Sequence, residues 1–144
     1  MTYLGGNPKG PDSVTIVDGT LISGTVNDVA ELDGVYLQIE EVSGTPGFDV
    51  IFDFSELRSF SSVMFHGRYE GNPSHEVFLQ MWDYSGSKWV DFSRLLSDSE
   101  DSVVSPRVRS NRFFDNGNAR VRFLHTTNGS TSHDLYIDLL SLRE

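Results

Sequence analysis

The stretch that decides the fold is residues 65–84, FHGRYEGNPSHEVFLQMWDY, because it returns in altered form at residues 123–140 as FLHTTNGSTSHDLYIDLL. Each copy places a hydrophobic run before a polar loop and a run of β-forming residues after it. The loops share the pattern G-x-x-S-H, followed by an acidic residue and three apolar or aromatic residues. We therefore predict that each copy forms two strands joined as a hairpin.

Similar short runs continue through most of the chain, and none has the 3.6-residue period of a helix. The dipeptide Asp18-Gly19 is typical of a hairpin turn. Pro106 limits residues 103–115 to an edge strand at best, because proline cannot donate a ladder hydrogen bond. Regular spacing of short strands predicts an all-β protein, an antiparallel jelly-roll β-sandwich of about 8–10 strands. The other runs are 14–17, 21–26, 35–40, 48–54 and 88–92.

Composition predicts one folded unit with an appended arm. The chain has 144 residues, no cysteine and a formal net charge of −10, a length that suffices for a single core without disulfides. Residues 1–12 are rich in Gly and Pro, so we predict an N-terminal flexible arm followed by the sandwich at 13–144. Negative charge disfavours nucleic acid and anionic membranes as partners. The absence of a long apolar run or signal-peptide pattern predicts a soluble chain that is not exported.

One segment runs against the acidic character of the chain. Residues 107–122 carry five arginines and a single acidic residue. We expect these arginines to be solvated or paired within the chain, and pairing with the acidic surface of a neighbouring copy is the alternative. They are Arg107, Arg109, Arg112, Arg120 and Arg122.

Several motifs together resemble a known domain. The motifs are the two G-x-x-S-H loops, FDFS at 52–55, QMWDY at 80–84 and LYIDLLSL at 135–142. Over residues 34–142 the chain resembles the jelly-roll β-sandwich of tailed-bacteriophage virion proteins, a domain similar to carbohydrate-binding modules and galactose-binding-like domains. The resemblance implies a binding surface and no enzyme.

What this resemblance implies first is a capsid decoration, or cement, protein on the outside of the head. It would be located in the virion, after assembly in the host cytoplasm, and would be a homo-oligomer, with a trimer as one arrangement. The arm would bind a capsid protein or another virion protein through Tyr3, Leu4, Pro8 and Pro11. The alternative is a glycan- or receptor-binding module of a head fibre or tail appendage.

All four histidines fall inside the two repeated units. We expect them and two serines to hold the loops by bonding backbone groups, without any metal or cofactor. Two alternatives stay open: a pH-sensitive contact, and a transition-metal site formed where histidines of both loops meet. The expected loop residues are His66, Ser74, His75, His125, Ser132 and His133.

Three aromatic residues surround one tight turn, namely Trp82, Tyr84 and Trp89. Exposed aromatic faces there would stack on sugar rings, so these are the candidate glycan-binding residues. The alternative is that they stabilise the sheet through cross-strand packing.

Acidic residues offer weaker candidates. The pairs Asp49 with Asp53 and Glu40 with Glu41 are conceivable glycosidase carboxylates, but strand carboxylates usually face water or an opposite charge. Three further acidic residues, Asp28, Glu31 and Asp33, suggest Ca²⁺ without matching the spacing of an EF-hand. We therefore predict no catalytic residues.

Overall fold

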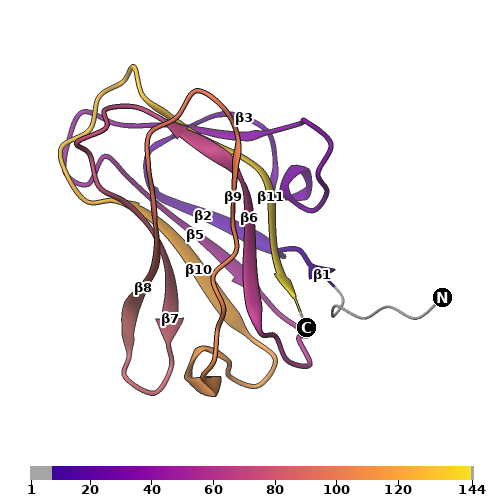
Figure 1. Cartoon of the computed structure of the whole chain (residues 1–144). Coiled ribbons are helices and arrows are strands. Elements are labelled where there is room, and N and C mark those ends of the chain that lie inside the picture. The colour runs from indigo at the N-terminus through magenta and orange to yellow at the C-terminus, as the bar shows by residue number, and fades with distance from the viewer. Residues whose placement is uncertain (1–7, 144) are drawn as a thin grey trace.

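The computed structural model describes residues 8–143, which form two antiparallel sheets packed face to face (Figure 1). The predicted all-β sandwich is therefore confirmed. One sheet contains, in spatial order, β3 (Thr20–Ser23), β4 (Leu37–Glu40), β11 (Asp134–Arg143), β6 (Ser62–Glu70) and β9 (Ser102–Val104), with β1 (Pro8–Lys9) also paired to β11. The other contains β2 (Ser13–Asp18), β5 (Phe48–Phe54), β10 (Ala119–His125), β7 (Val77–Asp83) and β8 (Lys88–Leu95). Two 3₁₀ turns, η1 (Val26–Val29) and η2 (Asn111–Phe113), complete the described elements.

Strict alternation of side chains builds the core between the sheets. Along β5, β6 and β10 every second residue is buried. Phe123 of β10 contacts Phe52 in its own sheet, with ring centroids 5.9 Å apart, and Phe65 of the opposite sheet at 5.3 Å. Burying each such side chain stabilises the fold by roughly 1.5–3 kcal/mol. The outward positions of β5 and β10 carry charged residues together with Ile51 and Leu124.

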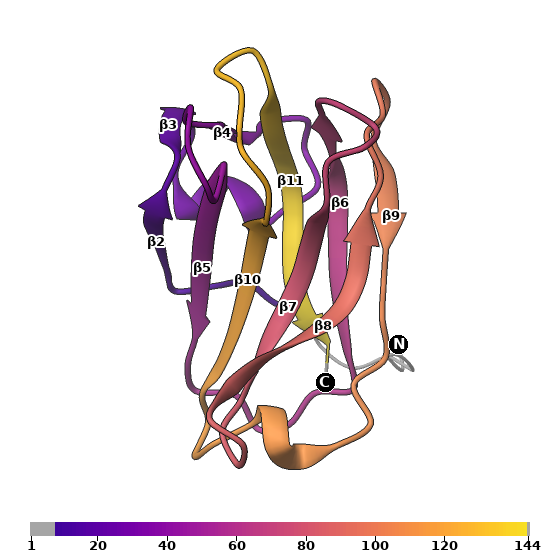
Figure 2. The same cartoon turned by 90° about the vertical axis from the view of Figure 1, so that its left-hand side faces the viewer.

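The predicted hairpins at residues 65–84 and 123–140 are wrong, because their strands lie in different sheets. β6 pairs with β11 and β9, whereas β7 pairs with β10 and β8. The second copy likewise places β10 and β11 in opposite sheets, as Figure 2 shows. Alternation predicts a strand and its buried face, but not its partner. Residues 71–76 and 126–133, named here the crossing loops, are long enough to span the roughly 10 Å between sheets.

The same correction applies to the turn at Asp18-Gly19, which leads from β2 in one sheet to β3 in the other. By contrast, the predicted turn between the strands that carry Trp82 and Trp89 is a hairpin, since β7 pairs with β8. β9 is a short edge strand beside β6, in line with the limit that Pro106 was expected to impose.

Part of the predicted arm lies on the sandwich. Pro8 and Lys9 pair with Arg143 and Leu142 of β11, and the side chain of Asp12 accepts hydrogen bonds from Ser55 N and Oγ at 2.7 and 2.8 Å. Pro8 is exposed and Pro11 partly exposed, whereas Tyr3 and Leu4 lie outside the described residues. Within residues 8–143, no helix is long and apolar enough to cross a membrane.

Candidate functional site

The β7–β8 hairpin brings two of the predicted glycan-binding residues together. Register pairs Trp82 directly with Trp89, and their ring centroids lie 5.3 Å apart at an interplanar angle of 66°. Both side chains point outward from the five-stranded sheet and are partly exposed. Tyr84 lies beyond the end of β7, in a recess that it shares with Asp53 and Asn118. Trp82 and Trp89 therefore form one aromatic surface, and Tyr84 stands at its border.

The hairpin turn is held by the carboxylate of Asp83. Its Oδ1 accepts hydrogen bonds from the backbone N–H of Ser85 and Gly86, both at 2.9 Å, and Arg112 lies 3.0 Å from Oδ2. Burial acts to raise the pKa of Asp83, but the hydrogen bonds from Gly86 and Arg112 outweigh it and lower the pKa. The turn, and with it the spacing of the two tryptophans, is thereby rigidly defined.

Ion pairs surround the tryptophans on the same sheet face. Arg120 Nε lies 2.8 Å from Asp53 Oδ1, and Arg122 Nε lies 3.2 Å from Asp49 Oδ1. Both guanidinium groups lie over the ring of Trp89, at 5.5 and 5.1 Å from its centroid. Such contacts fix the indole in place. Together with the ion pair of Arg112, they confirm intramolecular pairing for three of the five clustered arginines.

Some charged groups on this face are largely shielded from water, among them Asp49 and Arg122. Burial raises the pKa of Asp49, and the neighbouring Asp18 adds to this, although Arg122 opposes it. Gln80 lies on β7 and donates from Nε2 to Asp91 of β8 at 2.7 Å. Apolar rings beside fixed, planar hydrogen-bonding groups suit a sugar, whose C–H faces stack on aromatics while its hydroxyls take polar partners.

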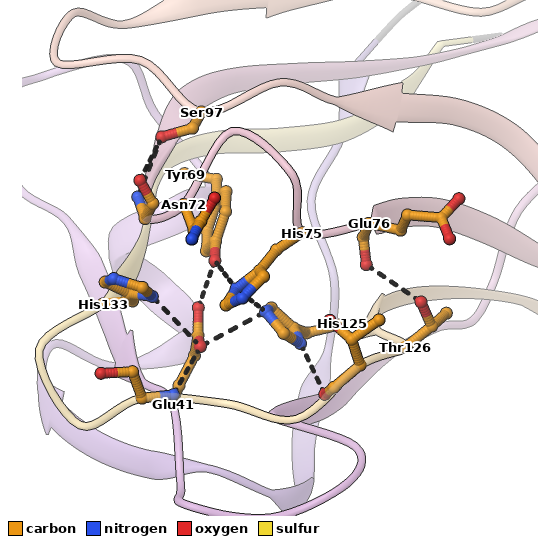
Figure 3. Close-up of polar contacts among 12 residues, drawn as sticks. Glu41, Tyr69, Asn72, His75, Glu76, Ser97, His125, Thr126 and His133 are labelled. Carbon is orange, nitrogen blue, oxygen red and sulfur yellow. Dashed lines mark hydrogen bonds and ion pairs between the residues drawn. The ribbon is translucent and has the colours of Figure 1, made fainter.

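A second cluster lies where the crossing loops meet, at one end of the sandwich (Figure 3). His75 comes from the first crossing loop, His125 ends β10 and His133 comes from the second crossing loop. All three surround Glu41, whose side chain is fully buried. Glu41 Oε1 lies 3.3 Å from His125 Nε2 and 3.5 Å from His133 Nδ1. His75 Nδ1 lies 2.9 Å from His125 Nε2.

Further hydrogen bonds hold this cluster in place. The hydroxyl of Tyr69 donates to Glu41 Oε2, and the backbone N–H of Ser130 donates to Oε1 at 2.9 Å. Burial, reinforced by Glu41, raises the pKa of Tyr69 far above its usual range. The crossing loops are also joined directly, since Thr126 N donates to Glu76 O at 3.0 Å.

His125 is the most buried of the four histidines and has two different ring environments. Its Nδ1 lies 3.0 Å from the carbonyl oxygen of Thr127, whereas its Nε2 faces Glu41 and His75. Burial lowers the pKa of His125, although the charge of Glu41 opposes the shift. A neutral ring is therefore favoured at neutral pH.

The remaining predicted loop residues do not join this cluster. His66 lies on β6, on the outer face of the six-stranded sheet, with Nδ1 3.9 Å from Asp101 Oδ2. Ser74 donates to Asn72 in its own loop, and Ser132 shares a 3.0 Å hydrogen bond with Ser130. His125 makes one contact of the expected kind, from Nδ1 to the carbonyl oxygen of Thr127 in its own loop, whereas its Nε2 faces Glu41 and His75.

Two members of the cluster, Glu41 and Tyr69, were not among the predicted site residues. The sequence does contain a pattern that indicates them. In three strands, the series of alternating buried residues ends on a titratable side chain. These series are Leu37, Ile39, Glu41; Phe65, Gly67, Tyr69; and Val121, Phe123, His125. A polar group at the end of a buried row needs a partner at the same depth.

The acidic candidates are mostly engaged elsewhere. Asp49 and Asp53 hold arginines, as described above. Asp28 accepts from the backbone N–H of Thr25 at 2.7 Å and so caps η1, and Asp33 Oδ1 accepts from Val35 N at 3.0 Å. These contacts give Asp28 and Asp33 local structural roles.

Comparison with known proteins shows the fold. No family model matches the chain, and no curated protein matches it either. Among solved structures, a substituted carbohydrate-binding module of family 29 is similar at a TM-score of 0.58, with 18% identity over 90% of each chain. Another module of this family, complexed with cellulohexaose, has a TM-score of 0.57 and 17% identity over 91% of this chain and 92% of that one. A third, complexed with mannohexaose, has 0.56 and 17% over 96% and 84%.

Proposed function

We propose that this chain is a non-catalytic glycan-binding module and that its binding surface is the outer face of the five-stranded sheet. The observation that carries this proposal is the partly exposed Trp82–Trp89 pair, held among ion-paired arginines and carboxylates. The aromatic rings supply apolar area, and the planar polar groups supply directional hydrogen bonds.

The size of the face suits an extended sugar chain. β8, β7, β10 and β5 lie side by side in this order, and they carry Trp89, Trp82, Arg120 and Asp53, respectively, on this face. Neighbouring strands are about 4.8 Å apart, so these strands span about 14 Å. That length accommodates several sugar rings.

The fold likeness supports the same class of ligand. Two of the similar modules were solved with cellulohexaose and mannohexaose, both neutral chains of hexose units. On this face, the arginines are already neutralised by Asp49 and Asp53. We therefore propose a neutral polysaccharide as the ligand. Carboxylates that are ion-paired with arginines can hold a sugar in place but are poor general acids or bases, which fits a binding role.

Titration calorimetry with cellohexaose and mannohexaose tests this proposal. Trp89→Ala should weaken binding of the preferred sugar at least tenfold, because it removes the ring beside both guanidinium groups. Tyr36→Ala is the matched control, since Tyr36 is a partly exposed aromatic residue on the other side of the sandwich. Full binding by Trp89→Ala, or loss of binding in Tyr36→Ala alone, would overturn the assignment of the face.

The capsid decoration role and the virion location stay predictions from the sequence resemblance. The similar structures are carbohydrate-binding modules and carry no link to virion proteins. The predicted capsid partner and homo-oligomer are likewise untested. Co-sedimentation of the purified protein with particles that lack it remains the direct assay for them.

A further inference from the structure

We propose that Glu41, His75 and His125 form a zinc-binding site that clamps the two crossing loops together at one end of the sandwich. The site is separate from the glycan-binding face, because His75 precedes β7 whereas Trp82 lies near its far end. It would therefore act on the stability of the fold and leave sugar binding in place.

The spacing of the donor atoms matches a tetrahedral ion. Zinc binds imidazole nitrogen and carboxylate oxygen at about 2.0–2.1 Å, which places neighbouring donors about 3.3–3.4 Å apart at the corners of a tetrahedron. Glu41 Oε1 and His125 Nε2 are 3.3 Å apart, and His125 Nε2 and His75 Nδ1 are 2.9 Å apart. The donor atoms of all three residues lie within 4.8 Å of one another.

The hydrogen bond of His125 presents the correct nitrogen. Because Nδ1 faces the carbonyl oxygen of Thr127, it carries the ring proton, and Nε2 is left with a lone pair. Histidines that bind metals characteristically donate the other ring N–H to a carbonyl or carboxylate in this way. Here the lone pair points toward Glu41 and His75 (Figure 3).

When both imidazole rings are neutral, no proton lies between Glu41 and His125. A proton on His75 Nδ1 can be donated to His125 Nε2, but Glu41 Oε1 then lies 3.3 Å from the same nitrogen with no proton between them. Two acceptors in contact at full burial repel one another. A divalent cation at the centre would turn this repulsion into three favourable contacts.

His133 borders the three donors but lies outside the group whose donor atoms are all within 4.8 Å of one another. Its Nδ1 is buried, has no hydrogen-bond partner within residues 8–143 and lies 3.5 Å from Glu41 Oε1. Its ring is only 22% exposed and lies 5.5 Å from that of His75. The two imidazoles and one carboxylate of the group form a ligand set that favours zinc over the harder Ca²⁺ and Mg²⁺.

An entry path leads to this side of the cluster. His133 borders a surface depression whose lining includes Glu70 and Asp98. Asp98 adds negative charge at the opening, which attracts cations, whereas Glu70 is paired with Arg68 at 2.7 Å. The backbone and hydroxyl contacts to Glu41 from Ser130 and Tyr69 keep its carboxylate oriented toward the histidines.

The test uses the full chain, purified without a polyhistidine tag, stripped with a chelator and reloaded with zinc. We expect one zinc per chain by elemental analysis after gel filtration and a rise in melting temperature, because an ion that binds only the folded state stabilises it. Cobalt(II) loading should give the intense visible bands of a tetrahedral site. Zinc at trace level, with an unchanged melting temperature, would overturn the proposal.

Variants assign the ligands. His75→Gln, in a partly exposed loop position that is expected to tolerate the change, should weaken zinc binding at least 100-fold and abolish the thermal shift. His66→Gln is the matched control, since His66 belongs to a different cluster with Asp101 and Asp138. Loss of zinc in His66→Gln, with retention in His75→Gln, would place the ion elsewhere and refute this site.

Discussion

The rings of His75 and His125 meet edge to face, with centroids 4.7 Å apart and facing nitrogens at 2.9 Å. The two residues lie far apart in the sequence, in the first crossing loop and at the entrance to the second. Their contact joins the two repeated units, so the repeat in the sequence becomes a pair of loops that pack against one another.

Close packing of these loops predicts a strong effect at one glycine. A Cβ atom on Gly129 would lie 2.3 Å from the carbonyl oxygen of Val42 and 2.7 Å from the Cα of Gly47. We expect Gly129→Ala to destabilise the protein by about 1–3 kcal/mol, because backbone must move to accept the methyl group. Gly44→Ala, whose Cβ meets nothing within 4 Å, is the control. Urea unfolding of both variants measures the difference, and equal stability would contradict the described packing.

A pH-dependent contribution is expected from Asp101. Its carboxylate accepts from Tyr36 Oη at 2.6 Å and from Arg68 at 2.8 Å. Burial acts to raise the pKa of Asp101, but these hydrogen bonds outweigh it and lower the pKa below 3.8. A carboxyl whose pKa falls on folding stabilises the folded state above its unfolded pKa, and this contribution is lost as the pH falls through the folded value.

Asp101→Asn should therefore lower the free energy of unfolding at neutral pH, and its deficit relative to the parent should shrink as the pH falls below about 4. Urea unfolding at a series of pH values measures the gap. Asp98→Asn, an exposed change in the same loop, serves as the control. A deficit that stays constant down to the lowest pH would show that the ionised carboxylate is not what stabilises the fold.

Truncation at the N-terminus should separate two parts of the predicted arm. Removing residues 1–7 keeps the pairing of Pro8 and Lys9 with β11 and the contacts of Asp12 with Ser55. Removing residues 1–12 eliminates these contacts. It should lower the free energy of unfolding by a further ~1–3 kcal/mol, since each lost hydrogen bond contributes about 1 kcal/mol. Thermal unfolding of the two truncated chains compares them. Identical melting temperatures would show that residues 8–12 add nothing to the fold.

Sugar binding should depend little on salt. Arg120 and Arg122 are already paired with Asp53 and Asp49. Because a neutral sugar also carries no charge, binding involves no attraction between net charges that salt could screen. We expect the dissociation constant to change less than about twofold between about 0.05 and 0.5 M NaCl. Calorimetric titration at both salt concentrations measures this. A steep loss of affinity with salt would instead indicate an anionic ligand.

The sequence predicted the strands better than their partners. Alternation in residues 48–54 gave both the strand and its buried face, because side-chain direction follows directly from a period of two. It gave no information on whether residues 65–84 close as a hairpin, since a polar loop serves a hairpin and a crossing between sheets equally well. Turn length did not settle the matter either, because the four residues between β7 and β8 close a hairpin whereas the single residue between β2 and β3 leads from one sheet to the other.

The candidate sites show the same limit. Trp82 and Trp89 could be grouped from the sequence because one turn separates them. The ion pairs of Arg120 with Asp53 and of Arg122 with Asp49 could not, since they depend on the pairing of β10 with β5. Glu41 joins the histidines only because β4 and β10, in opposite sheets, end at the same edge of the sandwich.

The most direct measurement is a titration of the ¹⁵N-labelled protein with cellohexaose and mannohexaose, followed through the indole N–H signals. The chain has two tryptophans, and both lie on the proposed face, so two signals report on it. We predict that both signals shift and saturate together with one of these sugars. Saturable sugar binding that leaves both signals in place, or no binding of either hexasaccharide, would contradict a glycan-binding face at Trp82 and Trp89.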